Sequence, residues 1–136
     1  MDALGAPETV ERSREIGKAA VLAMFAVAEM SCGAVLESNF NHYALPYLAA
    51  LPGSIVEVRC CCPRELALLR YRERSGTRHP GHLDADRVED ELWNDEVLQP
   101  LGVGRLIEVD TTTPVDIEAL VSEIVVARTL PPKEKK

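Results

Sequence analysis

Hydrophobic positions in the first third of the chain recur at helical spacing. Apolar side chains fall three and four residues apart between Val10 and Met30, while charged side chains occupy the first turns. Thr9 stands where a hydroxyl can cap a helix. The later half of this stretch is apolar nearly all round. The pattern therefore predicts a helix that ends at Ser31-Cys32-Gly33 and is buried against a sheet.

Three short apolar segments have the composition of buried strands. They are Ala34-Val35-Leu36, Ser54–Cys62 and Arg105–Val109. The second follows a Pro52-Gly53 turn and is rich in β-branched residues. Because such runs are too short for helices of ordinary length, we expect strands at all three places.

Helices are expected where a proline or a capping hydroxyl precedes a stretch with helical spacing. The expected helices are a helical turn or short helix in 41–51 broken at Pro46, one after Pro63 that stops at Ser75-Gly76, an acidic one from Asp84 to Glu96, and one from Pro114 to about Ala127 capped by Thr113. Strands that alternate with helices predict an α/β fold with three layers, in which helices flank a mostly parallel sheet. We expect one domain over residues 1–129 and a charged tail at 130–136.

Composition excludes several classes of function. The formal net charge of -7 argues against general nucleic-acid binding, which needs a broad basic surface. No run of about 18 apolar residues occurs, so no membrane association is expected. Met1–Val10 lacks the apolar core of a signal peptide, which makes the cytoplasm the expected location.

The four cysteines do not form a recognisable framework. Cys60, Cys61 and Cys62 are adjacent, and adjacent cysteines rarely satisfy disulfide geometry. Neither they nor Cys32 shows the CxxC spacing of zinc sites. Small buried residues at a strand end are the favoured interpretation, and a thiol or metal-binding function at Cys60–Cys62 is the alternative.

One stretch is strongly basic in this acidic chain. It holds five arginines within 15 residues, namely Arg64, Arg70, Arg72, Arg74 and Arg78. Arg70 and Arg74 stand four residues apart and would share one face of a helix. Arginine suits multidentate recognition of phosphate, so a small anionic ligand is one interpretation. A solvated helix face with surface ion pairs is the other.

Polar clusters follow the other two predicted strands. Glu37-Ser38-Asn39 comes directly after the first, where a carboxylate can hold Mg²⁺ through water, accept a proton from a hydroxyl, or cap a helix. Asp110–Thr113 leaves the last strand and either lines a base-binding pocket or caps the final helix. His79 and His82 have a spacing that is weak for a metal, so no metal ligand is assigned. Anion contact or loop packing is expected of them instead.

These segments together carry a resemblance. Val35–Phe40, Val56–Cys60, Arg70–Arg74 with Arg78–His82, and Glu108–Thr111 resemble, in this order, the later part of a P-loop kinase. Within the P-loop NTPase superfamily, the closest group is the AAA-type ATP-binding proteins that are similar to small-molecule kinases such as chloramphenicol phosphotransferase and gluconate kinase. The arginine lid with its Arg-His-Pro-Gly-His loop is the most specific part.

The resemblance implies an ATP-dependent phosphotransferase that uses ATP and Mg²⁺ and acts on a small hydroxyl-bearing substrate. It implies catalytic roles for Glu37, Arg70 and Arg74, substrate contacts for Ser38, Asn39, Arg78 and His79, and nucleotide contacts for Arg70, Arg74, Thr111 and Thr112. The two lid arginines would close on the ATP phosphates, and Glu37 and Asn39 would face the phosphoryl acceptor.

The chain departs from this family at one essential feature. No GxxxxGK[ST] loop occurs, and the Gly17-Lys18 pair lies inside a helical pattern. Such a loop supplies the backbone cradle and the lysine that hold the phosphates. We therefore expect a kinase-like domain that is incomplete at its amino terminus and inactive as this chain. Its exposed strand edge would favour a homo-oligomer. A non-catalytic α/β module that binds an anion or a protein partner through the arginines is the alternative.

Overall fold

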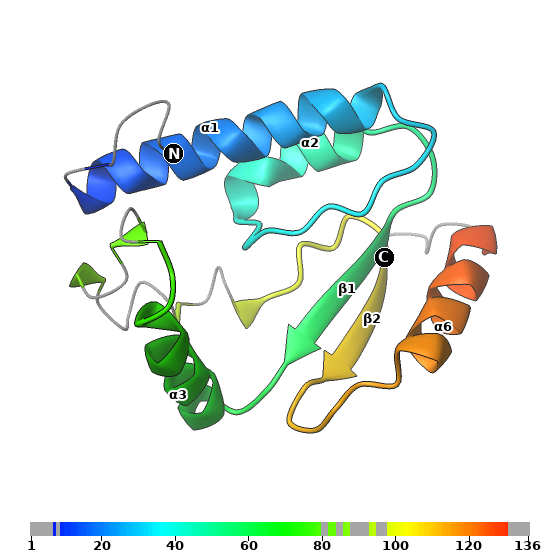
Figure 1. Ribbon diagram of the computed structural model, residues 1–136. Coiled ribbons are helices and arrows are strands. Elements are labelled where there is room, and N and C mark those ends of the chain that lie inside the picture. Colours follow the sequence, from blue (N-terminus) through cyan, green and yellow to red (C-terminus); the bar gives the residue numbers. More distant parts are fainter. Residues whose placement is uncertain are drawn as a thin grey trace.

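The computed structural model describes residues 7, 9–79, 82–83, 86–87, 93–94 and 98–130. Its elements run in the order α1 (Val10–Glu29), the 3₁₀ turn η2 (His42–Ala44), α2 (Leu45–Ala50), β1 (Val56–Cys61), α3 (Arg64–Ser75), β2 (Arg105–Asp110) and α6 (Ile117–Thr129) (Figure 1). The described residues thus form a mixed α/β structure with a two-stranded parallel sheet. Most of the predicted acidic helix at 84–96, the loop residues 80–81 and the tail 131–136 lie outside the described residues.

Helix α1 begins where the sequence predicts. The Thr9 hydroxyl accepts a hydrogen bond from the backbone N–H of Arg12 at 3.1 Å, which satisfies one of the free donors at the helix start. The helix ends at Glu29, and the Ser31 hydroxyl donates back to the Val27 carbonyl at 3.0 Å. Both ends of this prediction are confirmed.

The surroundings of α1 differ from the prediction that it is buried against the sheet. Phe25 is 1% exposed and packs with Ala44 and Leu48 of the η2–α2 segment. Figure 1 shows α1 and α2 lying side by side, with the strands beyond them. A two-stranded sheet is too narrow to cover a helix of 20 residues as well as α6. Val27 and Met30, at the end of α1, accordingly stay exposed.

The predicted strand at Ala34-Val35-Leu36 is wrong. The segment is not a strand, and its backbone joins no ladder within the part of the chain described. An extended segment becomes a strand only when a neighbour pairs with its backbone groups, and β1 pairs instead with β2. Val35 is 99% exposed, while Leu36 packs against the Phe25 cluster.

The other two predicted strands are confirmed as β1 and β2. They pair in parallel, with Val56 opposite Arg105 and Cys61 opposite Asp110. Arg59 lies opposite Glu108 and forms an ion pair with it at 2.8 Å. Arg59 also donates to the carbonyl of Leu98. Helix α6 packs against both strands, and the sheet residue Ile107 is buried.

The remaining predicted helices form with small changes. Helix α3 occupies Arg64–Ser75 after Pro63, as expected, and Pro46 lies in the first turn of α2 instead of breaking it. The last helix does not start at Pro114 with Thr113 as its cap. It starts at Ile117, because the Asp116 carboxylate accepts from the Ala119 N–H at 3.0 Å and supplies the cap. No helix in the described part is long and apolar enough to cross a membrane.

The Glu57 carboxylate joins the sheet to the helical core. It accepts hydrogen bonds from the backbone N–H groups of Leu101 at 2.6 Å and Gly102 at 2.9 Å. Leu101 and Val103 pack in turn against the Phe25 cluster. The segment that leads into β2 is therefore held to β1 through Glu57 and to the α1–α2 core through its apolar side chains.

Replacement of Glu57 by alanine is expected to lower the free energy of unfolding by about 2 kcal/mol. The change leaves two N–H groups, that of Leu101 partly buried and that of Gly102 exposed, without their charged acceptor. Glu57→Gln should lose less, since its amide retains one oxygen acceptor. Urea unfolding followed by circular dichroism measures both. Glu123→Ala on the exposed face of α6 is the control and should stay within about 0.5 kcal/mol of the parent. Equal stability of all three variants would contradict the linking role.

Candidate functional site

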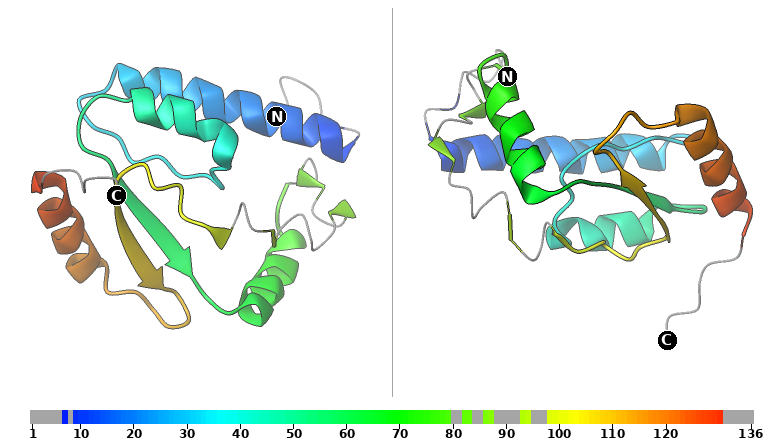
Figure 2. Two further views of the ribbon diagram at one scale, coloured as in Figure 1. Left: turned by 180° about the vertical axis from the view of Figure 1, so that it is seen from behind. Right: turned by 90° about the horizontal axis from the view of Figure 1, so that it is seen from below.

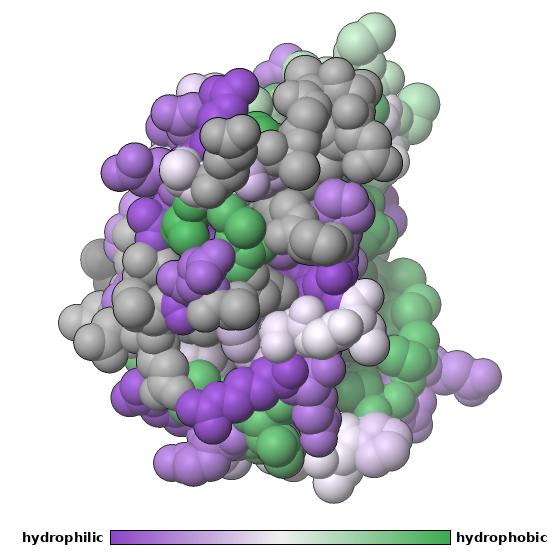
Figure 3. Space-filling model, turned by 60° about the vertical axis from the view of Figure 1, so that its left-hand side comes forward, coloured by the Kyte–Doolittle hydropathy of each residue, from purple (hydrophilic) through white to green (hydrophobic). Residues whose placement is uncertain are grey.

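The arginine stretch lies at the carboxyl end of the sheet. Helix α3 starts three residues after β1 ends at Cys61. Cys61 pairs with Asp110, the last residue of β2. Ligands of open parallel sheets bind beyond this edge, where the loops leave the strands. Figure 3 brings the α3 side of the molecule forward and shows hydrophilic side chains, with apolar ones between them, over the lower part of this face.

Arg70 connects α3 to the loop that leaves β2. Its Nη2 donates to the Thr111 carbonyl oxygen at 2.8 Å, and its Nη1 lies 3.5 Å from the Thr111 hydroxyl oxygen. Thr111 is itself attached to β1, because its N–H and its hydroxyl both donate to the Cys61 carbonyl, at 2.8 Å and 3.0 Å. Two residues expected in the site, 41 positions apart, thus come into direct contact.

Arg74 lies one helical turn further along the same side of α3 and is exposed. Its guanidinium carbon is 5.9 Å from the centre of the Tyr71 ring, close enough for a cation–π contact. The Arg74 carbonyl accepts from the N–H and the hydroxyl of Thr77, both at 3.0 Å, and from the Arg78 N–H at 3.2 Å. This tight turn ends α3, and Arg78, which is half-buried, follows Arg74 one turn further from the sheet than Arg70.

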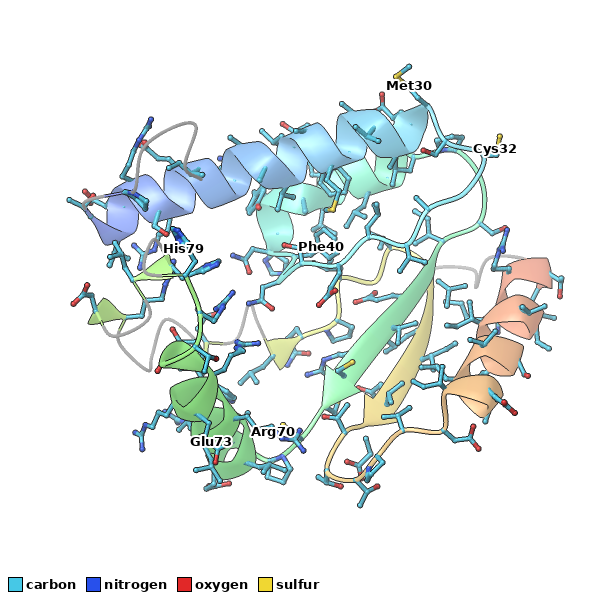
Figure 4. The ribbon with its side chains drawn as sticks, in the orientation of Figure 1. Met30, Cys32, Phe40, Arg70, Glu73 and His79 are labelled. Atoms are coloured by element: carbon cyan, nitrogen blue, oxygen red, sulfur yellow. The ribbon has the colours of Figure 1, made fainter. Side chains whose placement is uncertain are left out.

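His79 lies away from Arg70. Figure 4 places it near the beginning of α1, while Arg70 and Glu73 are on α3 at the other end of this region. The following segment is attached to α1 through Arg87, whose Nε donates to the His82 carbonyl at 3.3 Å and whose Nη2 donates to the Ser13 hydroxyl at 3.5 Å. Sequence reasoning missed Arg87, although a lone arginine in an acidic segment was a visible signal.

Glu37, Ser38 and Asn39 are exposed and are not brought together with the arginines. They precede Phe40, which stacks on Phe25 with ring centres 5.9 Å apart. Figure 4 shows Phe40 beneath α1 and well separated from Arg70. Because the segment before them forms no strand, no strand end in the described part of the chain holds these three residues at the carboxyl edge of the sheet.

The turn after β2 satisfies its own polar groups. The Asp110 carboxylate accepts from the Thr112 N–H at 2.8 Å. This backbone hydrogen bond is the main reason that the pKa of Asp110 lies below its ordinary value, and a hydrogen bond from the Thr112 side chain lowers it further. Asp110 therefore stays ionised at neutral pH and places a negative charge beside Thr111.

The described residues do not fit a magnesium site. Among them, no three histidine, cysteine, aspartate or glutamate side chains gather as ligands of a metal ion would. Magnesium requires oxygen ligands in octahedral geometry, and Glu37 has no second carboxylate beside it in its exposed segment. No step through Mg²⁺ is assigned to these residues.

The cysteines are free thiols. Cys61 and Cys62 are half-buried, as expected for small residues at a strand end, but Cys60 is exposed, contrary to that expectation. Cys60 lies opposite Val109 in the pairing of β1 with β2.

No family model matches the chain, and neither the curated proteins nor the solved structures include one that is significantly similar to it.

Proposed function

We propose that the chain is a phosphate-binding α/β domain of P-loop kinase type, in which α3 and the loop leaving β2 form the anion site. The contact between Arg70 and Thr111 is the observation that supports this most directly. It seats the arginine helix over the carboxyl edge of β1 and β2, where an α/β fold presents its ligand. The finer fold, a three-layer kinase-like sheet, belongs to the same proposal.

The donors at this edge suit a triphosphate. A guanidinium has five N–H donors, and Thr111 engages only part of those of Arg70. Arg74 is exposed one turn further on, and Arg78 follows the end of the helix. Arginines spaced in this way can contact successive phosphate groups with paired hydrogen bonds. Thr111 and Thr112 would lie beside the nucleoside of ATP.

The phosphotransferase part of the proposal concerns the chemistry that such a site serves. Arg70 and Arg74 would stabilise the charge that develops on a transferred phosphoryl group. Glu37 would orient or deprotonate the hydroxyl of a small substrate, with Ser38, Asn39 and His79 as further contacts. Since the chain contains no GxxxxGK[ST] loop, we expect these 136 residues to bind a phosphate ligand without transferring its phosphoryl group.

A non-catalytic anion-binding module is the second candidate. The separation of the Glu37–Asn39 segment from α3 favours it, because a kinase needs its acceptor-binding carboxylate beside the phosphate site (Figure 4). Both candidates share the arginine site, and neither predicts turnover by these 136 residues. Incubation with Mg²⁺, ATP and a panel of small alcohols and sugars tests this shared expectation. Phosphoryl transfer by this chain would overturn the expectation of inactivity.

The double variant Arg70→Ala/Arg74→Ala is expected to weaken binding of ATP and of tripolyphosphate by about ten-fold or more. Hydrogen bonds to charged groups account for this magnitude. Isothermal titration calorimetry at low ionic strength measures the effect, and added salt should weaken binding by the parent chain.

Single variants on one helix provide the matched control. Arg74→Ala should weaken binding several-fold, whereas Arg72→Ala, two residues away and so directed to another side of α3, should change it less than two-fold. Both remove one positive charge, so a difference between them reports position and not net charge. Binding that survives the double variant, or that falls equally for Arg72 and Arg74, would contradict the assigned site.

A further inference from the structure

Helix α6 is apolar on more sides than the sheet covers. Leu120, Ile124 and Ala127 face the strands and are half-buried or buried. Four further large apolar side chains of the helix are exposed, namely Ile117 (63%), Val121 (52%), Val125 (54%) and Val126 (58%). Figures 1 and 2 show α6 at the rim of the molecule, with the strands on one side only. A helix that is hydrophobic nearly all round is ordinarily buried.

The exposed residues form an ordered pattern. Glu118, Val121, Val125 and Arg128 are separated by three, four and three residues, which places them in one stripe along the helix. The two valines occupy the middle of this stripe, and charges of opposite sign occupy its ends. Neither the Glu118 carboxylate nor the Arg128 guanidinium forms an ion pair with any of the described residues.

We propose that this stripe is the docking surface for a second copy of the chain, in an antiparallel pair of α6 helices. If the two-fold axis passes beside residue 123, Val121 of each copy lies opposite the partner's Val125. The same arrangement sets Glu118 of each copy opposite the partner's Arg128. The stripe is thus complementary to itself when reversed, as a two-fold interface requires.

A parallel pair or an unrelated helix would not satisfy this charge pattern. In a parallel pair, each Glu118 would face another Glu118 and each Arg128 another Arg128, which is repulsive. The antiparallel pair forms two ion pairs, one at each end of a small apolar centre. It also leaves the arginine site open, since α3 and α6 lie at opposite sides of the sheet in Figure 1. The inference is independent of the proposed phosphate site.

Sedimentation velocity over a series of protein concentrations tests the surface. The parent chain should show a reversible monomer–dimer equilibrium, weak because one helix pair forms a small interface. Val121→Asp and Val125→Asp should each leave only monomer. Val126→Asp is the matched control, because it changes the same residue type at similar exposure but on another side of α6. Circular dichroism establishes that each variant is folded.

Charge exchange tests the orientation. Glu118→Arg and Arg128→Glu should each weaken the dimer roughly ten-fold, because both ion pairs become repulsive. A mixture of these two variants should restore association as a heterodimer. The arginine introduced at position 118 of one chain then faces the glutamate introduced at position 128 of the other, and the unchanged Arg128 faces the unchanged Glu118.

Three outcomes would overturn the proposal. The first is a parent chain that stays monomeric at all concentrations. The second is a dimer that is lost in Val126→Asp alone, and the third is a mixture of the two charge variants that associates no better than its components.

Discussion

Replacement of Phe25 by alanine is expected to lower the free energy of unfolding by about 3–5 kcal/mol, the largest loss predicted for a single side chain of this protein. Phe25 is 1% exposed and stacks with both Phe40 and Tyr47, whose ring centres are 5.9 and 5.7 Å away. Removal of its ring takes away the centre of the cluster that joins α1 to α2. The resulting cavity costs both the lost burial and the lost packing contacts.

Denaturant unfolding followed by circular dichroism measures this loss. Val27→Ala lies on the same helix at 67% exposure and is the control, expected to change stability by less than about 0.5 kcal/mol. Phe25→Leu should fall between the two, because leucine retains part of the buried volume. Equal stability of the Phe25 and Val27 variants would show that the α1–α2 cluster does not stabilise the fold.

The elements that sequence predicts well are those whose signals are local. The Thr9 cap, Pro63 before α3 and the two valines of β1 each lie within or beside the element they specify. The last helix shows the limit of such signals, because Thr113 and Asp116 are both good caps and only their geometry decides between them. Asp116 prevails, and Pro114 lies in the preceding turn.

Other features depend on residues that are distant in sequence. Val35 lies in a segment with the composition of a strand, but strand formation requires a neighbour, and the described sheet provides none beside it. The Glu57 carboxylate, on β1, accepts hydrogen bonds from two N–H groups 44 and 45 residues away. A charged residue that interrupts the apolar run of a strand was the one available signal for such a partner.

The candidate site likewise has one part that local sequence spacing predicts and another that depends on distant residues. Sequence spacing correctly places Arg70 and Arg74 on one side of a helix that follows a strand. It does not reveal that Arg70 reaches Thr111, because that contact depends on the register of β1 against β2. The sequence also misplaces Glu37. Its expected place at the sheet edge depended on a strand at Ala34-Val35-Leu36, and that strand does not form. The phosphate-binding half of the proposal therefore has more structural support than the phosphotransferase half.

Gly104→Ala is expected to destabilise the sheet by about 2–3 kcal/mol, although it adds a single methyl group. A Cβ atom at position 104 would overlap the carbonyl oxygen of Ile55 and lie 2.7 Å from its carbonyl carbon. That carbonyl cannot move freely, since it accepts a hydrogen bond from the Arg105 N–H at 3.2 Å, directly before the first paired residues of β1 and β2. The alanine must separate the strands where their pairing starts.

Gly17→Ala is the matched comparison for this substitution. Gly17 lies inside α1, and a Cβ added there has nothing within 4 Å and meets only open space. Alanine at this position should raise the free energy of unfolding by up to about 1 kcal/mol through its higher helix propensity. The same chemical change is thus expected to have opposite signs at two glycines. A loss at position 104 no larger than the change at position 17 would mean that Ile55 yields, and that the start of the parallel pairing is not the rigid point from which Glu57 and Arg59 are positioned.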